Sequence, residues 1–249
     1  MAEKHFIEQQ KHTRSYLIPY FERHLSVFKD LRVLEVGCAE AGFLDVLHHQ
    51  GFDAKGIELV AHRIELARQK NPDLDLIVGD ITDPEILNIA GAPFDLVVMR
   101  DVIEHIPDRY AVLKHLSILL KPGGHLFVSF PPRLSAFAGH QQNGSTWLRK
   151  IPYLQCLPVF MIKSLGRLAR EREEMIKEII RNKRYGLSIR AFEKVARKTG
   201  FNPVVKEHFV FRPIYQTRFN LKPRKIPAVP LIREIVTMGY ESLLQKKLH

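Results

Sequence analysis

The segment from Val33 to Phe43 limits the possible folds more than any other part of the chain. An apolar, β-branched run ends in Glu35 and Val36, passes into a turn of small residues, and leads into a helix-favouring stretch over residues 43–50. A strand, a tight turn and a helix N-terminus in this order let a ligand lie against bare backbone. Small side chains are needed there because a larger Cβ would block the approach. The segment therefore predicts a cofactor-binding βα unit.

Two classes of cofactor fit this turn. Gly37, Ala39 and Gly42 have the spacing of the dinucleotide fingerprint G-x-G-x-x-G, with Ala in place of the middle Gly. Glu35 stands two residues before the first Gly, where its charge would repel a pyrophosphate and favour a cationic group. A positively charged nucleoside cofactor is therefore favoured, and a nicotinamide dinucleotide stays the weaker alternative.

Three more strand-like runs end in acids. Residues 54–58 end in Glu58, 21 positions after Gly37, where a carboxylate can accept hydrogen bonds from both ribose hydroxyls. Asp80 follows the run that begins at residue 76, and Asp101 ends the run over 94–101; a fifth strand is expected over 125–130. Strands that alternate with helical stretches predict parallel βαβ units.

The order of these motifs resembles the class I S-adenosylmethionine-dependent methyltransferases. The stretch from Asp101 to His105 is similar to the methyltransferase-11-like branch that includes the ubiquinone-biosynthesis O-methyltransferases. The first family motif reads E/D-x-G-x-G-x-G, and the chain departs from it with Ala39 and Ala41, which we expect to be tolerated only if φ stays negative. The resemblance implies a Rossmann-like, doubly wound α/β sheet of seven strands, mostly parallel with one antiparallel strand.

The resemblance also implies S-adenosyl-L-methionine as the cofactor. In the family, the acid after the third strand meets the adenine amino group and the next residue packs on the ring. The cofactor contacts expected here are Glu35, Gly37, Cys38, Ala39, Gly42, Glu58, Leu59, Asp80, Ile81, Arg100 and Asp101.

The domain organisation follows from these motifs. We expect N-terminal helices over residues 1–30, the S-adenosylmethionine-binding core over 31–132, a lid or substrate insert over 133–186, the end of the core sheet over 187–220 and a basic extension over 221–249. Within the last two parts we expect a strand over 204–211, a final antiparallel strand over 213–219 and a helix over 231–244.

The connection after the fifth strand is long enough to have its own role, because long connections in compact domains are usually functional lids or linkers. We expect one helix there, from about Met161 to Asn182. Its apolar face either covers an apolar acceptor or packs on the domain; the face comprises Leu165, Leu168, Ile176 and Ile179.

Positive charge is concentrated in the second half of the chain. Residues 1–148 hold 15 Lys and Arg against 19 Asp and Glu, whereas residues 149–249 hold 23 against 8. A half with a net charge of +15 attracts RNA, an anionic membrane surface or a phosphorylated substrate. An apolar stretch before a basic helix favours a membrane surface among these. Cys38 and Cys156 lie in unrelated contexts, and no leader or long apolar span is visible, so we expect a cytoplasmic protein, with peripheral membrane contact left open.

The expected function is methyl transfer from S-adenosyl-L-methionine, most simply to oxygen of a small or lipid-like molecule. An oxygen acceptor must lose a proton, and His105 and His140 are the candidate general bases. The remaining histidines lack metal-ligand spacing, so no metal is expected. RNA methylation through the basic half and a non-catalytic, cofactor-binding partner protein remain the alternatives.

Overall fold

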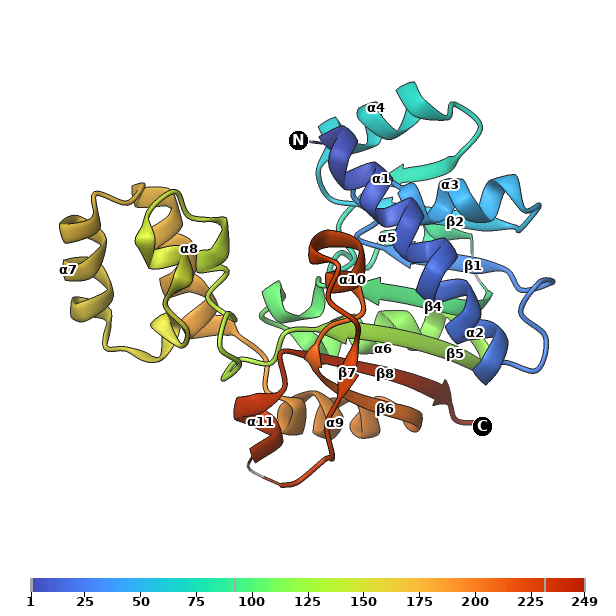
Figure 1. Cartoon of the computed structure of the whole chain (residues 1–249). Helices are drawn as coiled ribbons and strands as arrows, with labels where there is room; N and C mark the ends of the chain where they lie inside the picture. The colour runs from blue at the N-terminus through green and yellow to red at the C-terminus, as the bar shows by residue number, and fades with distance from the viewer. Residues whose placement is uncertain (1, 92, 231, 249) are drawn as a thin grey trace.

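The chain folds around one mixed β-sheet with helices on both faces (Figure 1). The computed structural model describes residues 2–91, 93–230 and 232–248. The strands are β1 (Val33–Val36), β2 (Ala54–Glu58), β3 (Asp75–Val78), β4 (Phe94–Arg100), β5 (Leu120–Phe130), β6 (Phe201–Phe211), β7 (Arg224–Lys225) and β8 (Gly239–Lys246). The helices are α1 (Ala2–His12), which continues through the π-helical segment η1 (Thr13–Leu17) into α2 (Ile18–His24), then α3 (Gly42–His49), α4 (Ala61–Lys70), α5 (Ile86–Ala90), α6 (Arg109–Leu119), α7 (Val159–Ala169), α8 (Glu173–Tyr185), α9 (Ile189–Lys198), α10 (Ile214–Phe219) and α11 (Ile232–Val236).

The strand order is β3-β2-β1-β4-β5-β8-β6-β7. Strand β1 pairs in parallel with β2 on one side and with β4 on the other, so the connections change direction at β1. This reversal is where open α/β sheets bind ligands. The predicted Rossmann-like, doubly wound architecture is therefore confirmed. The sheet has eight strands where seven were expected, because the two-residue β7 pairs with β6 at the edge.

The antiparallel strand is made by a different segment from the one expected. It is β8, which lies between β5 and β6 and is antiparallel to both. The predicted strand over 213–219 is wrong, since Ile214–Phe219 forms α10. The predicted helix over 231–244 is too long: α11 covers only Ile232–Val236, residues 239–244 belong to β8, and Leu231 lies outside the described residues. Strand β8 is buried on both faces, and a short run that is apolar on both faces cannot be told from a helix by periodicity.

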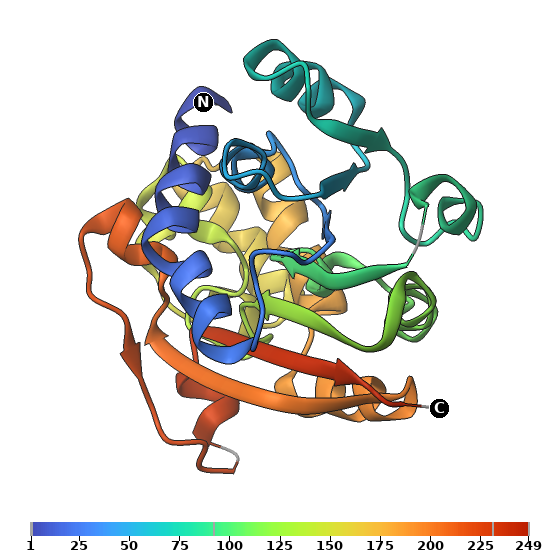
Figure 2. The ribbon, with the colours of Figure 1, turned by 90° about the vertical axis from the view of Figure 1, so that its right-hand side faces the viewer.

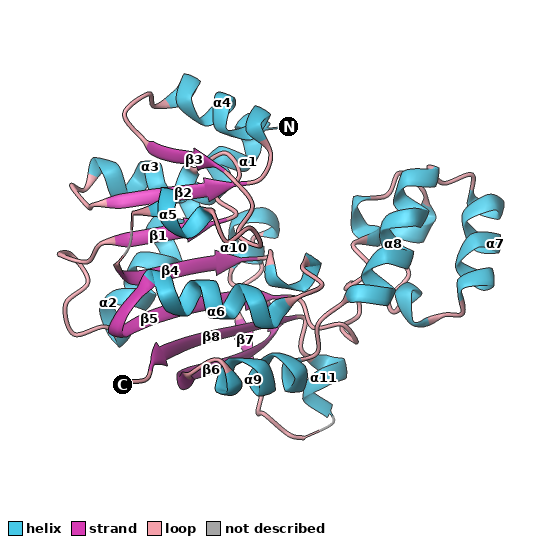
Figure 3. Ribbon diagram, turned by 180° about the vertical axis from the view of Figure 1, so that it is seen from behind, coloured by secondary structure: helices cyan, strands magenta, loops and turns pink. Residues whose placement is uncertain are grey.

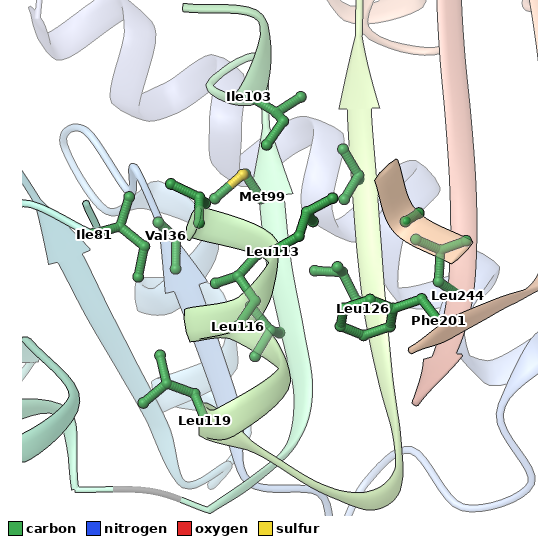
Figure 4. Close-up of a cluster of buried hydrophobic side chains, with 14 of the residues drawn as sticks. Val36, Ile81, Met99, Ile103, Leu113, Leu116, Leu119, Leu126, Phe201 and Leu244 are labelled. Carbon is green, nitrogen blue, oxygen red and sulfur yellow. The ribbon is translucent and has the colours of Figure 1, made fainter. Parts of the chain in front are cut away.

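Two apolar cores hold the helices to the sheet. On one face, α5, α6 and α9 pack on side chains such as Met99 and Leu126 (Figure 4). On the other face, η1, α2, α3 and α4 pack on Val98 and Phe127. Neighbouring residues of a strand belong to opposite cores because successive side chains point to opposite faces of a sheet. The same alternation of side chains between the two faces determines which polar residues at the strand ends lie on the face covered by η1 and α2.

Residues 133–186 form a helical insert that projects from the sheet (Figures 1 and 3). The single helix predicted from Met161 to Asn182 is wrong: α7 ends at Ala169 and α8 begins at Glu173, with Arg170 in a left-handed conformation at φ 53. The predicted apolar face packs mainly within the insert, because Ile176 and Ile179 join its own buried cluster. Leu168 is 75% exposed.

The N-terminal helices lie across the sheet and meet the C-terminal part of the chain. Helix α1 runs beside α10 (Figure 2) and also contacts α3, which follows the turn after β1. Two segments far apart in sequence therefore close the same end of the sheet, the end at which β1 and β4 finish.

We predict that Phe127→Ala lowers the free energy of unfolding by about 3–5 kcal/mol, because it removes a fully buried ring. Phe127 is 0% exposed, and its ring centroid lies 5.2 Å from that of Tyr20 and 5.3 Å from that of Phe21. Urea unfolding of Ile118→Ala, at a position 57% exposed on α6, serves as the control and should shift by no more than about 0.5 kcal/mol. Equal losses in the two variants would contradict this assignment of the core.

Candidate active site

A cavity of about 640 Å³ opens where β1, β2 and β4 end. Its size is that of a small-molecule site, and it lies where the strand order reverses. Eight of the expected cofactor contacts are in its wall: Gly37, Ala39, Glu58, Leu59, Asp80, Ile81, Arg100 and Asp101. The structure thus brings together residues from four separate strand ends.

The turn after β1 needs three residues with positive φ. Gly37 has φ +74, and a Cβ on it would lie 2.3 Å from Cγ2 of Val102. The expectation that Ala39 and Ala41 keep a negative φ is wrong, because their φ values are 54 and 60. A left-handed residue with a Cβ costs about 1–2 kcal/mol. A hydrogen bond of 2.8 Å from the Ala39 N–H to Oε2 of Glu58 holds the turn in this conformation.

Helix α1 covers the outer side of the same turn. The Gln9 amide donates to the carbonyl oxygen of Cys38 at 3.2 Å and accepts from the Gly42 N–H at 2.9 Å. Gly42 has no room for a side chain, since a Cβ would lie 2.5 Å from the carbonyl oxygen of Phe6. Cys38 and Gly42 therefore lie beneath α1 and anchor the turn to it. Gln9, which no sequence motif indicated, lies in the cavity wall.

Glu35 is 1% exposed and forms an ion pair with Arg100. Its Oε1 accepts from Nη2 of Arg100 at 2.5 Å, while its Oε2 is buried and has no hydrogen-bond partner among the described residues. Burial raises the pKa of Glu35, and the charge of Arg100 opposes that rise. A buried carboxylate oxygen without a partner is costly. Glu35 is not among the described residues that line the cavity, so the structure shows it bound to Arg100, which does line it, and its expected contact with the cofactor stays a prediction.

Two further acids, Glu58 and Asp80, line the cavity. The Oε1 of Glu58 accepts from the Val60 N–H at 3.0 Å, and Oδ1 of Asp80 accepts from the Thr82 N–H at 2.8 Å. An ionised carboxylate has about four lone-pair sites, so each can still accept from a ligand. These two acids and the tight turn suit an adenosyl donor that carries positive charge and no phosphate.

The two candidate bases lie together, beside a third side chain. The donor atoms of Glu104, His105 and His140 all lie within 4.8 Å of one another. His105 is in the cavity wall, whereas His140 packs on the His105 ring and its Nδ1 lies 3.3 Å from Oε1 of Glu178. Burial lowers the pKa of His105 to about 4 and raises that of Glu104.

One carboxylate and two imidazoles are a donor set that could hold a divalent transition metal. Spacing along the chain did not reveal this set, because His140 belongs to the insert, 35 positions after His105. The expected absence of a metal stays a prediction.

The sequence interpretation missed the far wall of the cavity. Arg212, Ile214, Arg218 and Glu241 lie in it, and the Arg212 guanidinium binds the Asp101 carboxylate. These residues follow no cofactor motif. No local signal marked Glu241, because the residues from Tyr240 to Leu244 are buried on both faces of β8 and do not alternate between apolar and polar.

The comparisons with known proteins agree with this geometry. A family model described as a methyltransferase domain matches residues 8–173, which is more than half of the chain. The chain therefore belongs to this methyltransferase family.

Curated relatives narrow the branch of the family. The ubiquinone biosynthesis O-methyltransferase of Xylella fastidiosa (strain M23) is 35% identical over 125 residues, which are 48% of this chain and 50% of that protein. The enzyme of the same name from Coxiella burnetii (strain Dugway 5J108-111) is 29% identical over 113 residues, covering 45% and 48%. The chain thus spans about half the length of the curated relatives it matches.

Solved structures support the fold. An S-adenosylmethionine-dependent methyltransferase from Mesorhizobium loti aligns with a TM-score of 0.58 at 16% identity, over 92% of this chain and 96% of that chain. The magnesium protoporphyrin IX methyltransferase of Synechocystis PCC 6803, which contains bound SAH, aligns with a TM-score of 0.56 at 15% identity, over 97% and 84%. The resemblance to the class I methyltransferase fold is confirmed.

We predict that Glu58→Ala and Asp80→Ala each weaken binding of S-adenosylhomocysteine, measured by calorimetry, by about 10- to 150-fold, because each removes a charge-assisted hydrogen bond of about 1.5–3 kcal/mol. Glu65→Ala, on the exposed side of α4, is the matched control and should bind as the wild type does. Unchanged affinity in both site variants would mean that the cofactor lies elsewhere.

Proposed function

We propose that this protein is an S-adenosyl-L-methionine-dependent methyltransferase that methylates an oxygen of a small or lipid-like molecule. The observation that carries the proposal is a single cavity with two unlike walls. The ends of β1 and β2 supply one wall, which suits the adenosyl donor. Ser129 and Glu241 lie in the other, polar wall, where a hydroxylated acceptor would lie.

Different side chains would bind the methyl donor and the acceptor. The turn at Gly37 and Ala39 would receive the donor, Glu58 would accept from its ribose hydroxyls, and Asp80 and Ile81 would hold its adenine. The cofactor supplies a methyl group already activated by a positive sulfur, so the protein mainly orients the acceptor in line with the leaving sulfur. His105 is the histidine that faces the acceptor, and His140 supports it from the insert.

The names of the curated relatives support an oxygen acceptor, and the insert supports a lipid-like one. On α7, Phe160 is 69% and Leu168 is 75% exposed, and Lys163 and Arg167 follow Phe160 at three and seven residues, on the same helical face as Phe160. An exposed apolar face with basic neighbours suits the surface of an anionic membrane. Across residues 2–91, 93–230 and 232–248, no helix combines the length and the apolar character needed to span a bilayer.

The function is tested by incubating the protein with methyl-labelled cofactor and separate pools of lipid extract, polar metabolites and total RNA. We expect the label in the lipid or metabolite pool. Label in RNA that falls steeply as salt is raised would favour RNA methylation instead, because phosphate contacts are salt-dependent. Cofactor binding with no label in any pool would favour a non-catalytic partner protein.

The membrane contact is tested by sedimentation with vesicles of phosphatidylglycerol and phosphatidylcholine. We predict that Phe160→Ser with Leu168→Ser weakens binding by about tenfold or more, since full burial of each side chain is worth about 1.5–3 kcal/mol. Ile118→Ser changes an exposed apolar side chain on α6, 57% exposed, and should have no effect. Equal binding by all three proteins would contradict a membrane role for α7.

A further inference from the structure

A row of polar side chains crosses four strands at the edge of the cavity. Arg100 of β4 is the register partner of Ser129 on β5, Ser129 that of Glu241 on β8, and Glu241 that of Glu207 on β6. Register partners point to the same face of a sheet. That face is the one covered by η1 and α2, because Phe127 and Leu243, two positions away along β5 and β8, pack in the same core as these segments.

Glu241 is the member of this row that is both buried and in contact with the cavity. It is 5% exposed, and it lies in the cavity wall together with Ser129, Asp101 and Arg212. Its Oε2 accepts a hydrogen bond of 2.7 Å from the hydroxyl of Tyr16, which η1 holds over the sheet. The carboxylate is therefore fixed in place by a donor from outside the sheet.

The surroundings of Glu241 set its affinity for a proton. Burial raises the pKa of Glu241 to about 7, the Tyr16 hydrogen bond and the charge of Arg212 lower it, and the charges of Glu207 and Asp101 raise it. Arg212 is itself bound to Asp101, and Glu207 is bound to Lys225. The titratable and charged groups near Glu241 are Tyr16, Tyr20, Asp101, Glu207, Arg212 and, through Glu207, Lys225.

We propose that Glu241 is the general base of the reaction and that Tyr16 positions its carboxylate; this assignment rests on the proposed methyl transfer to oxygen. The acceptor oxygen forms a bond to the methyl carbon as the carbon–sulfur bond breaks, and the electron pair of that bond stays on sulfur. The proton of the acceptor hydroxyl passes to the Glu241 carboxylate, which then releases it to solvent.

Glu241 suits this step better than the histidine in the same cavity. A general base works best when its pKa lies near the working pH. His105, with a pKa of about 4, is neutral but only weakly basic, and burial raises the pKa of Glu104, which disfavours its carboxylate form. Glu241 has a pKa of about 7, so both its carboxylate and its protonated form are populated at neutral pH.

The test compares the wild type with Glu241→Gln and Glu241→Asp, using an alkyl-substituted catechol as the acceptor probe from about pH 5.5 to about 8.5. We expect Glu241→Gln to lower kcat by about 100-fold or more and to abolish the fall in rate below neutral pH. Affinity for S-adenosylhomocysteine should stay within about threefold of the wild type, which shows that the variant folds. Glu241→Asp, which keeps the carboxylate, should recover part of the rate and the fall at low pH.

Substitutions at two neighbours of Glu241 should shift the pH dependence of the rate in opposite directions, which a purely structural role of Glu241 would not produce. Glu207→Gln removes a negative neighbour, so the pH at which the rate falls should move down while the rate at high pH is kept. Tyr16→Phe removes a donor to the charged form, so that pH should move up. Wild-type rates and an unchanged pH profile in Glu241→Gln would overturn the assignment.

Binding of the same catechol to the S-adenosylhomocysteine complex gives a readout that does not depend on turnover. We expect affinity to fall below neutral pH in the wild type and to be independent of pH in Glu241→Gln, because only an ionised carboxylate accepts the catechol proton. If the wild type and Glu241→Gln gave identical binding curves, the assignment of Glu241 as the general base would be overturned, whereas the proposed methyl transfer would stand. Failure of the wild type to bind the cofactor would overturn the proposed function itself.

Discussion

The hydrogen bond between the Ala39 N–H and the Glu58 carboxylate is the contact on which the candidate site depends. It ties the turn after β1 to the end of β2, holds Ala39 in a left-handed conformation, and turns the acid of β2 toward the cavity. From the other side, Gln9 secures the same turn at Cys38 and Gly42. A turn held from both sides presents its backbone in one geometry, and preorganisation of this kind lowers the cost of binding a ligand.

Much of this arrangement was predictable from local sequence. Acids that follow apolar runs, such as Glu58 and Asp80, mark the ends of parallel strands, and parallel strands end at one edge of a sheet. What local sequence could not show is where separate segments meet. His140 reaches His105 from the insert, and Gln9 reaches the turn from α1. Contacts of this kind depend on tertiary packing, which the pattern of a single segment does not encode.

The prediction of the C-terminal strand β8 failed for a related reason, because its position also depends on tertiary packing. Strand β8 has apolar side chains on both faces, such as Tyr240 and Leu243, so its pattern did not distinguish a strand from a helix. Its place between β5 and β6 is decided by pairing with strands distant in sequence. The same pairing delivers Glu241 to the cavity, so the error in secondary structure and the missed site residue have one physical origin.

The position of β8 also constrains how the protein is made. Strand β6 leaves the ribosome before its neighbour in the sheet exists, and β5 cannot pair with it directly because β8 belongs between them. Until β8 is synthesised, both strands present unpaired backbone edges, which are templates for pairing with other chains. Insertion of β8 closes these edges and completes the wall of the cavity, so one pairing step both protects the strand edges and finishes the candidate site.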